Sequence, residues 1–236
     1  MREFIIGINE AGQRLDKYLK KILPNASSGF LYKMLRKKNI TCNKAKMTGK
    51  EQLKKGDRIQ IFFSEETFMK FMQDPEKLKN EFEQLKTLPL KGLRVVYEDE
   101  DILIADKPYN MLSQKAKDHD ISANEYLLGY LIRSGSLELE GFASFRPSVC
   151  NRLDRNTTGL LLMGKSLNGS QTLSQALKDR TIRKFYRALV SGEIKESAHL
   201  SGYLRKDEKT NQVEILEKEA DNASYIETAY EPVAYK

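Results

Sequence analysis

Hydrophobic residues recur at helical spacing in two short segments near the start of the chain. Between residues 14 and 23 they stand three or four positions apart, which predicts an amphipathic helix that Pro24 ends. The same spacing returns between residues 30 and 35, and Ser27 or Ser28 is expected to cap this second helix. Two short helices are therefore predicted to come first.

The pattern then changes from helical to alternating. Residues 39–44 and 58–62 have the character of short strands, with a turn at Gly56 before the second one. Residues 64–90 return to helical spacing with charges of both signs, and they predict one connecting helix. Residues 93–108 then predict a strand, an acidic turn and a second strand.

This order of elements predicts an α+β fold with two domains. At 236 residues the chain exceeds the roughly 100 to 200 residues that one domain usually spans. We expect a small helix-helix-strand domain over residues 12–63 and a helical linker over residues 64–90. A mainly antiparallel mixed-sheet domain is expected over residues 91–236.

Positive charge is concentrated in the first of these domains. Residues 12–63 hold fourteen Lys and Arg residues and three acidic residues, a net charge of +11, whereas the whole chain carries +7. A domain this basic indicates a polyanionic partner, because the counterions released on binding supply much of the affinity. The alternative is that these lysines only solvate a helix surface.

The composition also argues against several classes of protein. No stretch approaches the roughly 20 continuous apolar residues of a membrane-spanning helix. The first ten residues lack the cleavage site of a signal peptide, so we expect a cytoplasmic protein without a membrane partner. The two cysteines and two histidines stand apart without the paired spacing of metal ligands, so no metal is expected.

Residues 151–162, Asn-Arg-Leu-Asp-Arg-Asn-Thr-Thr-Gly-Leu-Leu-Leu, contain the strongest candidate for chemistry. Asp154 stands between the cations Arg152 and Arg155, and small turn-forming residues and an apolar run follow. Neighbouring cations favour the ionised carboxylate, and an ionised carboxylate in a pocket is a ready nucleophile. The alternative from local chemistry alone is a surface ion pair that precedes a buried strand.

The motif around Asp154 resembles the catalytic signature of the RluA family of pseudouridine synthases, His/Asn-Arg-Leu-Asp-Arg-x-Thr-Ser/Thr-Gly followed by aliphatic residues. Residues 95–108 resemble the opening hairpin of the same family, which ends in a Lys-Pro step. Residues 181–192 resemble its Lys-x-Tyr-x-Ala-Leu-Val-x-Gly strand. Without the resemblance, Tyr186 would be a core residue and Lys107 a residue that caps a strand or forms a salt bridge.

The resemblance implies an isomerase that needs no cofactor. Such enzymes cut the bond between ribose and uracil and rejoin the ribose to carbon 5 of the base. Asp154 would act either by attack on the anomeric carbon or by abstraction of the neighbouring sugar proton. The uridine must leave the RNA stack, and Arg152 would pair with Asp154 or replace the extruded base. Arg155 and Lys107 would contact phosphate, and Tyr186 would stack on the uracil.

The basic amino-terminal segment resembles the alpha-L RNA-binding module, in which two helices and a small sheet grip structured RNA. The likeness covers residues 14–16, 27–36 and 40–44 and the Gly56-Asp57 turn. The family usually has Ser-Arg where this chain has Ser27-Ser28, so one phosphate contact is expected to be absent. The RNA-binding residues predicted in this module are Arg14, Ser27, Lys33, Arg36, Lys37, Lys38, Asn43 and Lys44.

In the RluA family a third active-site segment follows a Thr-x-Tyr strand. Residues 228–230 match that strand, but the third segment is not in this sequence, so we expect a C-terminally incomplete catalytic domain. The leading prediction is a pseudouridine synthase whose partner is RNA. Ribosomal RNA is favoured over transfer RNA because the alpha-L module often accompanies ribosomal targets in this family.

Two alternatives to this enzyme stay open. One is a non-catalytic RNA-binding or ribosome-associated protein, because the third active-site segment is missing. The other is a hydrolase of free nucleosides, which would usually need a second carboxylate. The sequence does not determine an oligomeric state.

Overall fold

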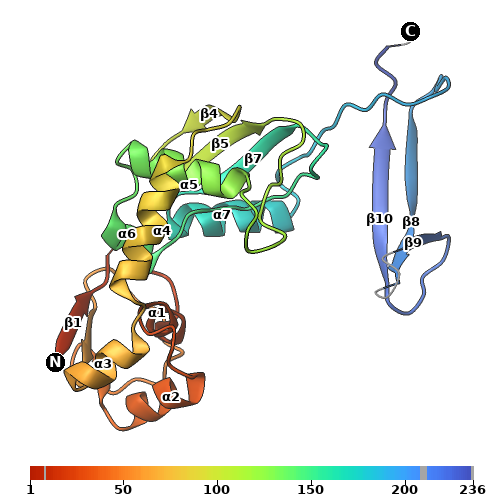
Figure 1. Ribbon diagram of the computed structural model, residues 1–236. Coiled ribbons are helices and arrows are strands. Elements are labelled where there is room, and N and C mark those ends of the chain that lie inside the picture. The colour runs from red at the N-terminus through yellow and green to blue at the C-terminus, as the bar shows by residue number, and fades with distance from the viewer. Residues whose placement is uncertain (8, 208–211, 235–236) are drawn as a thin grey trace. The chain divides into compact units, whose positions relative to one another are not determined.

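The computed structural model describes residues 1–7, 9–207 and 212–234, and the chain divides into two compact units, residues 1–183 and 184–236. The first unit combines helices with antiparallel sheets, and the second contains a separate antiparallel sheet (Figure 1). The predicted α+β class is therefore confirmed. The predicted domain boundaries stay a prediction.

The first unit contains two hydrophobic cores. One is drawn from residues 6–68 and the other from residues 82–163. The elements around the amino-terminal core gather at one end of this unit (Figure 1). They are β1 (Arg2–Ile5), α1 (Leu15–Ile22), α2 (Ser28–Arg36), β2 (Ile40–Cys42), β3 (Arg58–Ile61) and α3 (Glu65–Phe71).

Both predicted helices and both predicted strands of this part are confirmed. The Ser27 side chain caps α2 by accepting a hydrogen bond from the backbone N–H of Phe30 at 3.2 Å. The three strands form an antiparallel sheet in the order β1-β3-β2. Strand β1 was not predicted, because its four residues are too few to establish an alternating pattern without the partner strand.

Residues 64–90 form two helices rather than the single helix predicted. Helix α4 (Pro75–Thr87) starts anew because proline has no backbone N–H and disfavours helical geometry in the residue before it. Asp74 instead caps α4 by accepting a hydrogen bond from the backbone N–H two residues on, at 2.9 Å. Phe68 of α3 lies in the amino-terminal core and Phe82 of α4 in the second core, so the break separates the two.

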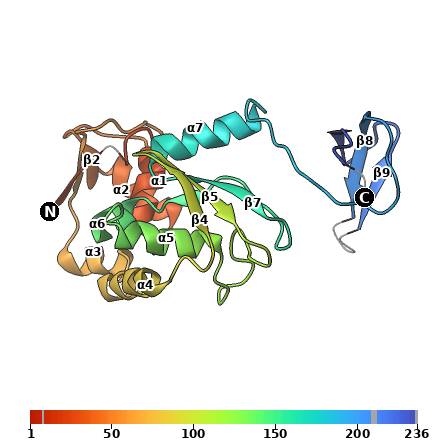
Figure 2. The ribbon, with the colours of Figure 1, turned by 90° about the horizontal axis from the view of Figure 1, so that it is seen from above.

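The second core lies between a four-stranded antiparallel sheet, in the order β4-β5-β7-β6, and the helices α4, α5 and α6. The predicted hairpin is confirmed as β4 and β5. Helix α7 follows β7 in the chain and packs against it (Figure 2). The bounds are β4 (Arg94–Glu98), β5 (Ile102–Lys107), α5 (Ala123–Arg133), α6 (Leu139–Ser144), β6 (Ser148–Val149), β7 (Gly159–Gly164) and α7 (Leu167–Lys178).

Two features set the packing of this core. In the apolar run of β7, Leu161 and Met163 are buried, whereas Leu160 is 54% exposed. Successive strand residues point to opposite faces, and only one face of the sheet contacts the core. Helix α5 lies close to the end of α4 because Gly129 has no side chain: a Cβ there would lie 2.3 Å from the carbonyl oxygen of Leu85.

The second unit is a three-stranded antiparallel sheet of β8 (Ala198–Lys206), β9 (Val213–Leu216) and β10 (Ala223–Tyr230), in the order β10-β8-β9. The strand predicted at residues 228–230 is confirmed as the end of β10. The strand predicted over residues 181–192 is wrong, because none of the described strands pairs with this segment and strand backbone needs a hydrogen-bonding partner. Across the described residues, no helix is long and apolar enough to cross a membrane.

Candidate active site

Asp154 lies in the loop between β6 and β7, and the backbone just before it is held by a buried serine. Ser113 accepts a hydrogen bond from the backbone N–H of Leu153 at 2.9 Å and donates one to the carbonyl oxygen of the same residue at 2.6 Å. After the aspartate, the N–H of Thr157 donates to the carbonyl oxygen of Asp154 at 3.0 Å and closes a turn. The backbone around Asp154 is therefore constrained, while its side chain is exposed.

The start of the same loop is joined to β7 by the side chain of Asn151. Its Oδ1 accepts a hydrogen bond from the backbone N–H of Leu162 at 2.8 Å, and its Nδ2 donates to the carbonyl oxygen of Leu160 at 3.0 Å. One amide side chain thus satisfies a donor and an acceptor of the strand. The asparagine at the first position of the motif has a structural role in this geometry.

Lys107, at the end of β5, connects two loops from inside the protein. It is completely buried, at 0% exposure, and its Nζ donates to the carbonyl oxygens of Met111 at 2.9 Å, Pro108 at 3.2 Å and Arg155 at 3.3 Å. Burial lowers the pKa of Lys107, whereas the negative charge of Asp154 raises it. The ammonium group therefore ties the loop after β5 to the loop that carries Asp154.

This position corrects the expectation that Lys107 contacts RNA phosphate. A fully buried ammonium group whose three N–H donors are taken by carbonyl oxygens has no surface to offer a polyanion. The geometry favours the other role considered for this residue, which is structural. From its buried position, Lys107 stabilises the aspartate loop through its hydrogen bond to the carbonyl oxygen of Arg155.

Arg152 and Arg155 flank Asp154 in the sequence, and both side chains are exposed. Within the described part of the chain, neither guanidinium group forms a salt bridge with Asp154. The surface ion pair considered from the sequence is therefore not what holds this loop. Both guanidinium groups are open to solvent.

Tyr186 belongs to the second unit, whereas the loop of Asp154 belongs to the first. Tyr186 is 62% exposed and lies in a segment without helix or strand. The site described within the first unit therefore does not include this residue. Its expected contact with uracil stays a prediction.

In the amino-terminal module, some predicted RNA-binding residues have partners inside the module. Arg14 donates to both carboxylate oxygens of Asp16, at 3.1 Å and 2.6 Å, and the hydroxyl of Tyr32 donates to the same group at 2.7 Å. The hydrogen bond from Arg14 lowers the pKa of Asp16, and the one from Tyr32 lowers it further. Arg14 thus contributes to an internal network.

Asn43 also has structural contacts. It adopts a left-handed backbone with φ of 51°, donates to Asp57 at 2.8 Å and accepts from the N–H of Arg58 at 2.9 Å. These bonds shape the turn after β2. Ser27 likewise uses its hydroxyl as the cap of α2.

The remaining basic residues predicted to bind RNA are exposed. They cluster at the end of α2 and in the turn after β2, and none of them has a salt bridge among the described residues. This group is Lys33, Arg36, Lys37, Lys38 and Lys44.

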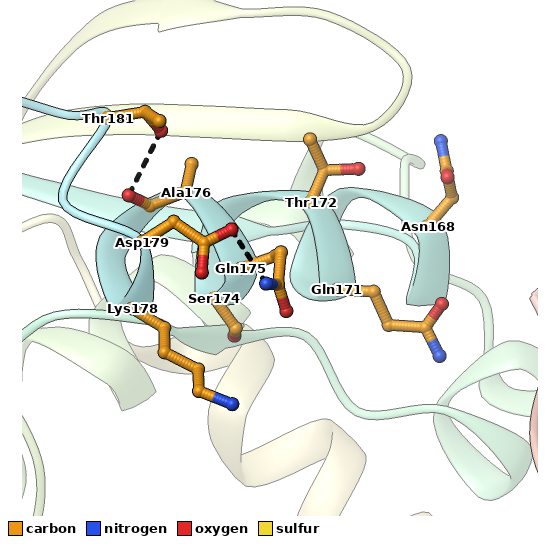
Figure 3. Close-up of a pocket in the computed structure, with 9 residues that line it drawn as sticks. All are labelled: Asn168, Gln171, Thr172, Ser174, Gln175, Ala176, Lys178, Asp179 and Thr181. Atoms are coloured by element: carbon orange, nitrogen blue, oxygen red, sulfur yellow. Dashed lines mark hydrogen bonds between the residues drawn. The ribbon is translucent and has the colours of Figure 1, made fainter.

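The surface hollows formed by the described residues include one along α7 and one beside the aspartate loop. The larger, about 800 Å³, lies along α7, where Gln175 donates to Asp179 at 2.7 Å (Figure 3). None of the predicted site residues lines it. The smaller, about 340 Å³, lies next to the aspartate loop, and it is lined by Lys91, Pro108, Tyr109, Asn110, Met111, Leu112, Asp120, Ile121, Tyr126 and Arg155.

Sequence reasoning missed Ser113. It lies in a segment without helical or alternating periodicity, and its partner Leu153 is forty positions away. No local pattern marked it.

Across the part of the chain that the structure describes, no three His, Cys, Asp or Glu side chains gather as metal ligands would.

Catalytic residues often lie on loops that a rigid scaffold holds in place, and the exposed carboxylate of Asp154 on its constrained loop has this arrangement. A profile of the RNA pseudouridylate synthase family matches residues 101–236, which include β5, the Asp154 loop and β7. This match spans more than half of the chain. The chain belongs to the RNA pseudouridylate synthase family.

Known proteins of the same family resemble the chain over most of its length. An uncharacterized RNA pseudouridine synthase of Mycoplasma genitalium is 27% identical over 99% of this chain and 69% of its own length. The ribosomal large subunit pseudouridine synthase C of Rickettsia felis is 30% identical over 96% of this chain and 70% of its own length. Among solved structures, human RNA pseudouridylate synthase domain containing 4 aligns with 64% of this chain and 56% of its own, at a TM-score of 0.39 and 12% identity.

Proposed function

We propose that this chain converts specific uridines of large-subunit ribosomal RNA to pseudouridine, with Asp154 as the nucleophile. The observation that carries the proposal is the exposed carboxylate on a loop held by Ser113, Asn151 and Lys107. The family supports the reaction. Ribosomal RNA is favoured because the Rickettsia felis relative is named a ribosomal large subunit enzyme.

The reaction needs a group that can act on a ribose carbon and then leave it. The bond between C1′ of the ribose and N1 of uracil breaks, the base turns, and C1′ bonds to C5. The proton on C5 is released and N1 gains one, so the net change is an isomerisation. A carboxylate can attack C1′ or remove the neighbouring sugar proton, and both routes return Asp154 unchanged.

The residues around Asp154 would position its loop and contact the RNA substrate. Lys107 acts as a positioning residue, because its bond to the carbonyl oxygen of Arg155 holds the loop before substrate arrives. Arg152 would fill the space left by the extruded uridine or pair with Asp154, and Arg155 would contact phosphate. Tyr186 would stack on the uracil and assist removal of the C5 proton.

The amino-terminal module would hold structured RNA through the exposed cations at the end of α2. Its net charge of +11 over residues 12–63 provides a sequence-independent attraction to phosphate. Such a module orients the substrate, while the aspartate loop acts on one flipped nucleotide. Cytoplasmic location is part of this proposal, because ribosomal RNA is the proposed substrate.

The test is tritium release from unmodified ribosomal and transfer RNA labelled at C5 of uridine. Asp154→Asn is expected to reduce release to background while RNA affinity stays within a few-fold, since the amide has the shape of the carboxylate without its nucleophilicity. Asp118→Asn, at another exposed loop carboxylate, is the matched control and is expected to keep full activity.

Full activity of Asp154→Asn would refute the nucleophile assignment. RNA binding without release from either RNA would instead indicate a non-catalytic RNA-binding protein. Release from transfer RNA alone would refute the ribosomal substrate.

A further inference from the structure

We propose that the 340 Å³ hollow beside the aspartate loop binds one nucleotide that flanks the target uridine, with its base stacked on Tyr109 and its phosphate near Lys91 and Arg155. The inference rests on the proposed function, because the flanking position is defined relative to the uridine at Asp154. It adds Tyr109 and Lys91 to the residues expected to contact RNA.

The hollow lies where two loops meet. The three hydrogen bonds of Lys107 bring the segment from Pro108 to Met111 against the backbone of Arg155, and these same residues line the hollow. Asp154 is not part of the lining. The uridine that reacts must contact Asp154. The lining includes Arg155, the residue directly after Asp154, so the hollow suits the nucleotide next to the uridine in the RNA strand.

The lining offers an aromatic surface for a base. Tyr109 is 64% exposed, and the described contacts give neither its ring nor its hydroxyl a partner. The side chains of Met111 and Tyr126 in the same lining are buried, whereas Ile121 is exposed. Unstacked RNA bases are commonly bound on exposed aromatic rings, because every base has a π-face.

The charge of the lining suits a phosphate group. Lys91 and Arg155 are exposed cations, and the Nζ of Lys91 lies 5.7 Å from the centre of the Tyr126 ring. Asp120 is the one acidic residue of the lining, and its carboxylate accepts hydrogen bonds from the backbone N–H groups of residues 116 and 117 at 3.1 Å and 2.8 Å. The lining therefore has a net positive charge.

Two residues that line the hollow have an uncommon backbone conformation. Lys91 and Asn110 have left-handed backbones, with φ of 48° and 59°, and they reach the hollow from separate segments of the chain. Non-glycine residues adopt this conformation rarely, and at Lys91 and Asn110 it shapes the two segments that line the hollow. A volume near the lower end of ligand pockets, which span about 300 to 1,000 Å³, suits one nucleotide rather than a helical segment of RNA.

The test uses a single-stranded RNA of seven nucleotides with one central uridine among cytidines, in which 2-aminopurine replaces the cytidine on one or the other side of that uridine. It is bound to the full chain carrying Asp154→Asn, which prevents turnover. Stacking on Tyr109 is expected to quench the fluorescence of one of the two probes. Tyr109→Ala is expected to abolish this quenching and weaken binding about tenfold, and Tyr109→Phe is expected to restore both.

Matched controls separate this hollow from general RNA affinity. Tyr97→Ala removes a similarly exposed tyrosine from β4, outside the hollow, and is expected to change neither quenching nor binding. Lys91→Ala is expected to weaken binding about threefold and to flatten its salt dependence. Lys79→Ala, at an exposed lysine on α4, is expected to have no effect.

Unchanged quenching and affinity in Tyr109→Ala would overturn this inference, even if the chain releases tritium. A chain that releases no tritium but quenches through Tyr109 would overturn the proposed function alone. Circular dichroism of Tyr109→Ala verifies that the variant is folded.

Discussion

At the scale of single residues, the charged groups of Asp154 and Lys107 differ in their exposure to solvent. Asp154 is exposed, whereas Lys107 is buried with three carbonyl partners that match the three donors of its ammonium group. Burial opposes the charge of Lys107 and the charge of Asp154 supports it. The aspartate therefore also helps to keep protonated the lysine that holds its own loop.

A prediction at this scale concerns Asp16. Its pKa is lowered chiefly by the hydrogen bond from Arg14, so its contribution to stability is present above the ordinary pKa of 3.8 and is lost as pH falls through the lower folded value. Asp16→Asn is expected to lower the unfolding temperature at pH 7 by about 2 to 4 °C, because Arg14 is half exposed and solvent screens the pair. The deficit should shrink below pH 3.8.

Thermal unfolding of both proteins from pH 3 to pH 7 provides the measurement. Asp118→Asn, at an exposed carboxylate, is the control and should follow the original chain at every pH. A deficit of equal size at all pH values would show that the charge of Asp16 is not the cause.

At the scale of elements, proline and glycine set the geometry that joins the two cores. Pro75 separates α3 from α4, so that each helix packs on a different core. Gly129 lets α5 approach the end of α4. The helix α2, in contrast, buries Leu31 and Leu35 and leaves a row of cations at its end.

A prediction at this scale concerns the exposed end of α2. Charge reversal by Lys37→Glu together with Lys38→Glu is expected to weaken RNA binding and to reduce the slope of log affinity against log salt by about one to two units. The slope falls because a complex with fewer phosphate contacts releases fewer counterions from the RNA. The same reversal at Lys77 and Lys79, on exposed positions of α4, is the control. Filter binding at several salt concentrations measures both. An equal effect of the two double variants would mean that net charge, rather than this surface, determines binding.

At the scale of the whole molecule, the two units differ in how they are stabilised. The first contains two cores, and contacts such as the hydrogen bond between Ser144 and Glu10 and the approach of Lys21 to the Phe145 ring, 5.6 Å, connect the parts around them. In the described residues of the second unit, no hydrophobic side chain is buried. Apolar burial is the main source of stability, so the second unit is expected to unfold first.

Limited proteolysis tests this difference. Arg183, Lys184 and Arg187 are exposed in a segment without helix or strand, so trypsin is expected to cut there first and leave a resistant fragment that ends near residue 183. Mass spectrometry of the early fragments identifies the sites. First cuts between α3 and α4 would instead show that the junction of the two cores is the weakest part of the chain.

The sequence by itself determined those features that depend on neighbouring residues. The spacing of Leu15, Tyr18 and Leu19 was sufficient for α1, and the acidic turn between two apolar runs was sufficient for the β4–β5 hairpin. The family motif marked Asp154 as the candidate nucleophile. Such signals are local, because helix and strand periods and turn chemistry repeat over a few residues.

Only the tertiary structure decided what depends on residues far apart in the chain. The bond of Ser113 to Leu153, the burial of Lys107 beneath two loops and the hollow next to Arg155 arise where segments about forty to fifty positions apart meet. The strand expected over residues 181–192 failed for the same reason, since a strand exists only with a partner. Hydrogen bonds and burial depend on which segments meet in the fold, and a pattern along the chain does not contain that information.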